Sequence, residues 1–266
     1  MHPALQHHID LCNNVSLPAG RHRFLIGAEQ VGWIDPRILP ELHGFEGIAQ
    51  HGDAVVLNAA LAATLPDIAR TIAFRGFYRY RREAFDVRAT PDGPAITTID
   101  RGALPAFGIA AVGVHVNGLV RKRDGLHLWV ARRAADKPLD PGKLDHIVAG
   151  GVSAGMTAME TLIKEAEEEA AIPPELASRA VARSVISYTM LRPEGLRRDL
   201  LHCYDLELPE NFVPLAADGE VESFELWPMR QALETVMAGD AFKFNVNLVL
   251  IDLFTRLNLA TEIVAG

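Results

Sequence analysis

The sequence predicts an α/β protein with a mixed sheet, rather than a chain of repeated βαβ units. Two observations carry this prediction. Stretches of β-forming residues come before and after one strongly acidic helix, and a second, apolar helical stretch follows the last strand. The chain has 266 residues, of which 49% are hydrophobic, so it can bury the core of one large domain or of two smaller ones.

Residues 1–104 are expected to form a smaller α+β domain. Strands are predicted at 23–26 and 32–34, and a helix over 59–73. Alternation of Tyr and Arg over 75–82 favours an amphipathic strand over a nucleic-acid surface. A turn is predicted at Thr-Pro-Asp-Gly-Pro, residues 90–94, and Asp100-Arg101-Gly102 followed by Pro105 marks the domain boundary.

Residues 105–266 are expected to form the second domain, an α/β sandwich. It opens with a run over 107–120 that is rich in β-forming residues. Asn117-Gly118, a pair typical of turns, marks the end of this run. Further strands are predicted at 127–131, 183–190, 200–206 and 221–226, and helices at 229–237 and 245–257, while a loop over 137–143 leads into 147–151.

The acidic helix of this second domain is the most informative feature. Thr157 and Glu160 fit a capping box, which places the helix start at about residue 158. Glu165, Glu168 and Glu169 are three and four positions apart, so they share an exposed arc of about 100°. Like charges at this spacing repel unless a counter-charge is present. A hard divalent cation such as Mg²⁺ supplies that charge, and the helix is predicted to bind metal.

Composition excludes several functions. The formal net charge of −8 argues against broad binding to nucleic-acid backbones. Cys12 and Cys203 are too few for a disulfide framework, so a reducing cytoplasm is expected. No run is long enough to span a bilayer and the start lacks a signal-peptide pattern, so no membrane partner is expected. The histidine-rich start is predicted to be weakly ordered, and a homodimer is left open.

The segment from Gly150 to Ile172 resembles the Nudix box, the signature of pyrophosphohydrolases. Gly150 takes the first glycine, Lys164-Glu165 the Arg-Glu pair, and Glu168-Glu169 the paired glutamates. Met156 stands where that signature has an early Glu, and Ala171 where it has a late Gly.

A wider likeness covers nearly the whole chain. It includes the segments 92–94, 100–108, 113–118, 141–145, 160–170 and 218–225. These are similar to the Nudix branch associated with thiamine pyrophosphokinase, whose members carry an additional N-terminal domain. The resemblance implies a Nudix α/β/α sandwich preceded by an N-terminal domain that helps to select the substrate. It also implies removal of phosphate from diphosphates of thiamine or of its oxidised analogues.

The resemblance gives the acidic helix a catalytic role. Glu165, Glu168 and Glu169 would hold one or more Mg²⁺ ions, with Mn²⁺ as a substitute, and these would hold a small-molecule diphosphate. Lys164 would orient Glu165 by an ion pair. Glu160, one turn before Lys164, would bind a second metal through water, although its role in the capping box is the simpler expectation.

Other groups would complete the reaction. The candidates for substrate contacts are backbone groups of the glycine pair and two cations near the end of a strand: Gly150, Gly151, Arg132 and Arg133. A general base that activates water is expected elsewhere in the chain, with Glu220 and Glu222 as candidates.

Alternatives remain at this point. ADP-ribose or a nucleoside diphosphate sugar would suit the same chemistry, and some Nudix domains bind ligands without hydrolysis. Gly151-Val152-Ser153-Ala154-Gly155 also matches the nucleophile elbow of serine hydrolases. The only histidine after Ser153 is His202, only three residues from Asp199, which disfavours a catalytic triad. A P-loop is excluded because Met156-Thr157 replaces the required Lys-Ser/Thr pair.

Overall fold

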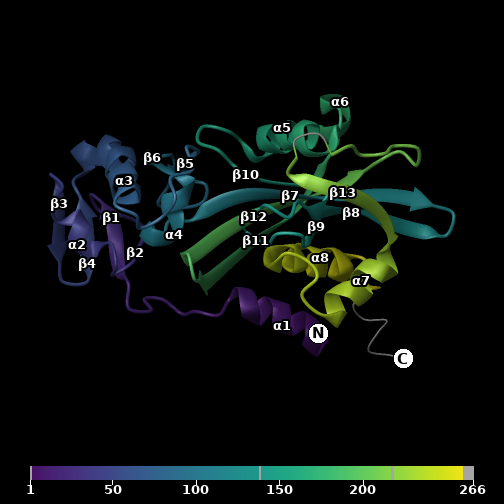
Figure 1. Ribbon diagram of the computed structural model, residues 1–266, viewed down its shortest axis with the longest axis horizontal. Helices are drawn as coiled ribbons and strands as arrows, with labels where there is room; N and C mark the ends of the chain where they lie inside the picture. Colours follow the sequence, from purple (N-terminus) through teal and green to yellow (C-terminus); the bar gives the residue numbers. More distant parts are fainter. Residues whose placement is uncertain (1, 138, 217–218, 260–266) are drawn as a thin grey trace.

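The computed structural model describes residues 2–137, 139–216 and 219–259. A small N-terminal domain lies beside a larger C-terminal sandwich (Figure 1). In the sandwich, α5 (Ala158–Ala170) covers one face of a seven-stranded sheet, and α7 (Met229–Ala238) and α8 (Phe244–Arg256) cover the other. The predicted α/β sandwich with a mixed sheet, preceded by a smaller α+β region, is therefore confirmed.

The N-terminal domain contains two sheets. The first has four strands in the order β2-β1-β4-β3, in which β1 and β4 are parallel, and the second pairs β5 with β6. Its strands are β1 (His22–Ile26), β2 (Glu29–Ile34), β3 (Ile48–His51), β4 (Ala54–Leu57), β5 (Ala84–Val87) and β6 (Thr97–Asp100). Its helices are α2 (Leu39–Leu42), η1 (Ala59–Thr64), α3 (Leu65–Phe74), η2 (Arg101–Ala103) and α4 (Leu104–Phe107).

The central sheet of the C-terminal domain has the order β11-β12-β7-β8-β13, with β10 also paired to β7 and β9 to β8. Only β7 and β12 run parallel among its described pairs. The strands are β7 (Ala111–Lys122), β8 (Gly125–Arg133), β9 (Leu144–His146), β10 (Val148–Gly151), β11 (Val181–Arg192), β12 (Gly195–Glu207) and β13 (Val221–Pro228). The helices are α5 (Ala158–Ala170), α6 (Pro174–Ala177), α7 (Met229–Ala238) and α8 (Phe244–Arg256).

Two apolar cores hold this sandwich together. Under α5, Leu162 and Ala166 pack against Val114 and Val116 of β7. On the opposite face, α7 and α8 pack against residues of β8 such as Val130. Even-numbered residues of β7 at 114 and 116 thus face α5, because successive side chains of a strand point to opposite faces.

The first helix, α1 (Pro3–Cys12), does not belong to the N-terminal domain in space. It packs against α7 and α8, where Leu5 joins the apolar core and His8 Nε2 donates a hydrogen bond to Val236 O at 2.8 Å. The predicted weakly ordered start is therefore wrong from residue 2 onward. The sequence did not reveal that Leu5, His8 and Cys12 form one buried stripe.

Several predicted boundaries were also wrong. Phe107 ends helix α4 rather than beginning a strand, because Gly108 adopts the left-handed conformation that closes a helix. Asn117-Gly118 lies inside β7 rather than in a turn. A Cβ at Gly118 would lie 2.8 Å from Ile147 Cγ2, so this glycine allows close packing. The run 75–82 is not a strand, since Asp100 accepts the backbone N–H groups of Arg81 and Glu83.

Candidate active site

Helix α5 begins where the capping box predicts. Thr157 Oγ1 accepts the Glu160 N–H at 3.2 Å, and Glu160 Oε2 accepts the Thr157 N–H at 2.8 Å. Both bonds satisfy backbone donors that the first helical turn would otherwise leave unpaired. The carboxylate of Glu160, a candidate metal ligand, is thus used to start the helix.

The three central glutamates differ in burial. The side chain of Glu168 is 51% exposed, that of Glu165 is 20% exposed, and Glu169 is buried. The expectation that all three lie on an exposed face is therefore wrong. Helix α5 turns Glu165 and Glu169 toward strand β10 and leaves only Glu168 at the rim.

Strand β10 is shaped to receive these two carboxylates. A Cβ at Gly150 would lie 2.5 Å from Cγ and 2.7 Å from Cδ of Glu165, so only glycine leaves room for that side chain. The neighbouring Ala149 donates its N–H to Glu169 Oε2 at 3.0 Å. The glycine of the sequence motif therefore serves to admit a glutamate of the helix.

Lys164 bridges two of the carboxylates. Its Nζ lies 3.1 Å from Glu165 Oε1 and 2.6 Å from Glu168 Oε2. The predicted ion pair between Lys164 and Glu165 is present. Oxygens of Glu165 and Glu168 thus converge on one cationic group.

Burial disfavours the ionised forms of the inner glutamates. It raises the pKa of Glu169 well above its ordinary value, despite the hydrogen bond from Ala149. It also raises the pKa of Glu165, against the opposing effect of Lys164. The negative charge of Glu220 adds to both upward shifts, so Glu220 lies close enough to act on both groups.

This burial leads to a prediction about stability. Because the folded-state pKa of Glu169 is raised, its protonation stabilises the fold fully below the unfolded pKa of about 4.3, and this contribution is lost as pH rises through the folded pKa. Without divalent metal, Glu169→Gln should therefore raise Tm at neutral pH by about 2–4 °C. Thermal melts in EDTA at about pH 4 and pH 8 would measure this.

The gain should shrink at the acidic pH, where the native carboxyl is also neutral. Glu167→Gln is the matched control, because Glu167 is exposed on the same helix. A loss of Tm at pH 8 in Glu169→Gln, relative to this control, would contradict the claim that the buried charge destabilises the metal-free fold.

The other residues predicted to take part in catalysis or substrate binding differ in their contacts. Glu220 pairs with Lys137, whereas Glu222 is exposed at an irregularity in the β13–β8 pairing. Arg132 donates from Nη1 to Gly142 O at 3.0 Å. Gly151 lies against the ring of Phe85 from the N-terminal domain. Asp218, in the acidic segment 218–225, lies outside the described residues.

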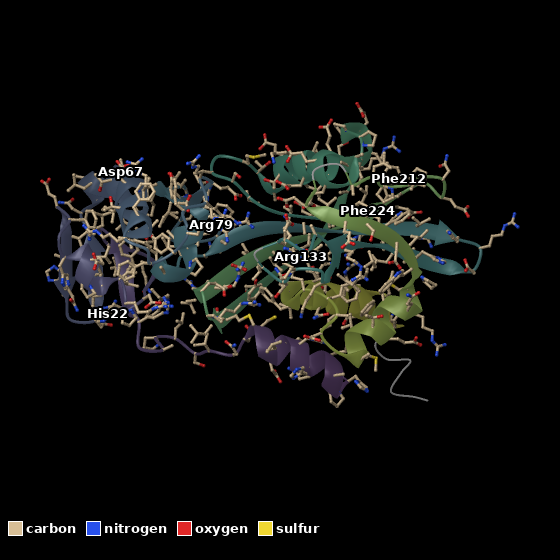
Figure 2. All side chains as sticks on the ribbon, viewed as in Figure 1. His22, Asp67, Arg79, Arg133, Phe212 and Phe224 are labelled. Carbon is tan, nitrogen blue, oxygen red and sulfur yellow. The ribbon has the colours of Figure 1, made fainter. Side chains whose placement is uncertain are left out.

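Arg133 has a structural role. It donates to the carbonyl oxygens of Leu139 and Asp140 and forms a 2.7 Å ion pair with Asp145. Its side chain is only 14% exposed, and Figure 2 shows it near the middle of the C-terminal domain in this view. Its guanidinium thus fixes the loop before β9, and contact with phosphate remains only a prediction.

Comparison with known proteins places this arrangement in a family. The NUDIX domain matches residues 111–247 and includes the whole of α5. This chain belongs to the Nudix family. A domain of unknown function, DUF4743, matches residues 4–111. The predicted Nudix membership with an additional N-terminal domain is thereby confirmed, while the exact boundary at 104/105 stays a prediction.

Two curated relatives support the same conclusion. Nudix hydrolase 24, chloroplastic, from Arabidopsis thaliana is 38% identical over 259 residues, covering 93% of this chain and 71% of the relative. Nudix hydrolase 20, chloroplastic, from the same plant is 37% identical over 266 residues, with the same coverage. A crystal structure of DR0079 from Deinococcus radiodurans matches 64% of this chain and 98% of its own, with 23% identity and a TM-score of 0.49. The two Arabidopsis relatives confirm the predicted hydrolase class.

A buried polar cluster in the Nudix domain was missed by sequence reasoning. His115 of β7 and His146 of β9 bring their Nδ1 atoms to 3.0 Å, beside Asp145. Burial lowers the pKa of His115 and lowers that of His146 to about 4, so both rings are neutral at neutral pH. The three side chains have the spacing of metal ligands.

The charges around this cluster favour a structural role. Lys243 and Arg133 overcome the effect of burial and hold the pKa of Asp145 below its usual range. Two cations already neutralise the carboxylate, which leaves little attraction for a metal ion. This cluster gave only a weak signal in the sequence, because His115, His146 and Lys243 come from widely separated segments of the chain.

The serine hydrolase alternative finds no support in the geometry. Asp199 and His202 lie on opposite faces of β12, since they are three positions apart in a strand. Asp199 instead pairs with Tyr188 and Arg197.

A membrane-spanning helix needs about 20 apolar residues, and none of the helices within residues 2–137, 139–216 and 219–259 meets that requirement.

Proposed function

We propose that this Nudix hydrolase is a Mg²⁺-dependent pyrophosphohydrolase that releases phosphate from a diphosphate ester. The observation that carries the proposal is the convergence of Glu165 and Glu168 on one cationic nitrogen, with Glu169 also turned toward β10 and Gly150 leaving room for the Glu165 side chain. Lys164 draws Glu165 and Glu168 together, and the charge of Glu165 also acts on the buried Glu169, so three ionised carboxylates here favour a counter-charge stronger than one lysine.

The donor set fits a hard divalent cation. It offers carboxylate oxygens from two turns of one helix, with no cysteine or histidine among them, which suits Mg²⁺ or Mn²⁺. When bound, the ion would neutralise diphosphate oxygens and polarise the bond that is cleaved. Lys164 would then release Glu168 and remain a positive charge beside the site.

Other residues would position the reactants. Glu220 is the better candidate for the general base, because its charge helps to raise the pKa of both Glu165 and Glu169. Glu222 is not among the causes of either raised pKa. Glu220 would hold a water and accept its proton. Backbone groups at Gly150 and Gly151, and the Arg132 guanidinium, would contact phosphate oxygens.

The thiamine branch supplies the proposed substrate. The resemblance over segments along nearly the whole chain favours thiamine diphosphate or its oxidised analogues, which would give the monophosphate and inorganic phosphate. A reducing compartment such as the cytoplasm fits this proposal, because Cys12 and Cys203 are free and buried.

A phosphate-release assay tests the proposal. Purified protein would be incubated with Mg²⁺ and thiamine diphosphate, oxidised thiamine diphosphates, ADP-ribose or a nucleoside diphosphate sugar. We expect fastest release from the thiamine-type diphosphates and complete loss in EDTA. The ADP-ribose and sugar reactions would be followed through their monophosphate products. Cleavage of none of these compounds, with tight binding of one of them, would instead identify a ligand-binding module.

A further inference from the structure

The N-terminal domain touches the Nudix box directly. The loop between β10 and α5 lies along strand β5, where Ala154 donates its N–H to Ala84 O at 2.8 Å. Gly155 donates to Asp86 Oδ2 at 3.3 Å. A Cβ at Gly151 would lie 2.5 Å from Cζ of Phe85, so the absence of a side chain at Gly151 leaves room for the aromatic ring.

A cavity of about 150 Å³ opens at this junction. The N-terminal domain contributes Phe85 and Arg88 to its wall, and the Nudix domain contributes Val112, Met156 and His202. Residues from both domains are therefore needed to form it. An apolar cavity of about 150 Å³ is large enough for benzene, so this one has room for a single aromatic ring.

The cavity is aligned with the carboxylate site. Ala158, which also lines it, is seven positions before Glu165 on α5. These residues are two turns, or about 10.5 Å, apart along the helix and only about 20° apart around it. On β10, Gly150 contacts Glu165 while the next residue, Gly151, contacts Phe85. A short diphosphate ester could therefore reach from one site to the other.

The lining is electrically balanced. Arg88 pairs with Asp86 at 2.7 Å, which neutralises the main charges of the wall. Burial lowers the pKa of His202, so at neutral pH its ring offers one hydrogen-bond donor and one acceptor. Such a wall would suit a flat heterocycle with a few polar atoms better than a phosphate group.

We propose that this cavity between the domains holds one monocyclic heteroaromatic ring of the substrate, such as one of the two rings of a thiamine-type diphosphate, while the carboxylates of α5 hold its diphosphate. This inference rests on the proposed function. It assigns Phe85, Met156 and His202 to ring recognition. The N-terminal domain then selects diphosphates that carry a monocyclic ring, because the fused rings of a purine exceed the space.

Ligands without a diphosphate bond allow a test that is independent of turnover. Thiamine monophosphate, adenosine monophosphate and inorganic phosphate would be titrated into the full chain by NMR. Saturation transfer would be recorded on the ring protons of the two organic ligands, and ³¹P line broadening would report the binding of inorganic phosphate. Wild-type protein should bind thiamine monophosphate more tightly than adenosine monophosphate. Met156→Trp, which fills the cavity, should weaken thiamine monophosphate binding tenfold or more and leave phosphate binding unchanged.

Two further variants complete the experiment. Leu191→Trp adds the same indole to an exposed position on β11 and should bind all three ligands as wild type does. Met156→Ala enlarges the cavity and should shift preference toward adenosine monophosphate. The inference would be overturned if Met156→Trp bound thiamine monophosphate as tightly as wild type does. It would also be overturned if wild type bound thiamine monophosphate and adenosine monophosphate equally tightly.

The two proposals can fail separately. If diphosphates are hydrolysed in a Mg²⁺-dependent manner but Met156→Trp binds the ring normally, only the ring site is wrong. If ring binding follows the expected pattern but no diphosphate is cleaved, only the hydrolytic function is wrong.

Discussion

Glu168→Gln is expected to lower kcat for diphosphate hydrolysis by about 10²–10³-fold while the protein remains folded. The substitution preserves shape but removes a charge that the proposed metal site requires. Glu168 is 51% exposed and forms its ion pair with Lys164 at the rim, so no buried network is broken. Steady-state kinetics at saturating Mg²⁺ and a thermal melt would measure both effects.

Glu167→Gln is the matched control for this result. It removes the same charge from the adjacent position of α5, but Glu167 is exposed and lies about 160° around the helix axis from both Glu165 and Glu169. Its kcat should stay within about twofold of wild type. A wild-type rate in Glu168→Gln would show that Glu168 does not take part in catalysis.

The second large effect is expected from Gly150→Ala. The new methyl group would lie 2.5 Å from Glu165 Cγ, so the carboxylate must leave its place against β10. Catalysis depends on placement to within fractions of an ångström, and we expect kcat to fall by about 10²-fold. The clash is with a side chain rather than with backbone, so the fold should persist.

A double-mutant cycle separates this mechanism from general damage. If Gly150→Ala acts through Glu165, adding it to Glu165→Gln should cost little further activity. Gly44→Ala is a suitable control, since the closest atom to its Cβ would be 4.0 Å away. Multiplicative losses in the double mutant would contradict the assigned role of Gly150.

Local signals in the sequence were sufficient for much of the fold. The capping box at Thr157 and Glu160 fixed the start of α5, and runs of β-forming residues located β8, β11, β12 and β13. The misread segments are those in which tertiary packing overrides a local preference. Gly118 is needed because Ile147 packs against the strand, and no pattern near Gly118 reveals that contact.

The site was predictable only in part for the same reason. The spacing of Glu165, Glu168 and Glu169 follows from helix geometry, but their unequal burial depends on where β10 lies. The wall of the inter-domain cavity joins Phe85 to His202, which are more than one hundred residues apart and belong to different domains. Such a juxtaposition arises when domains dock, and neither segment carries a motif for it.

The packing of α1 has a consequence for how this protein folds during synthesis. The partners of His8 and Cys12 are Val236 and Phe244, at sequence separations of 228 and 232 residues. The ribosome therefore releases this helix long before the surfaces that cover it exist. The apolar stripe of α1 therefore stays exposed until α7 and α8 have been synthesised. A nascent chain stalled before that point would present an aggregation-prone segment to chaperones.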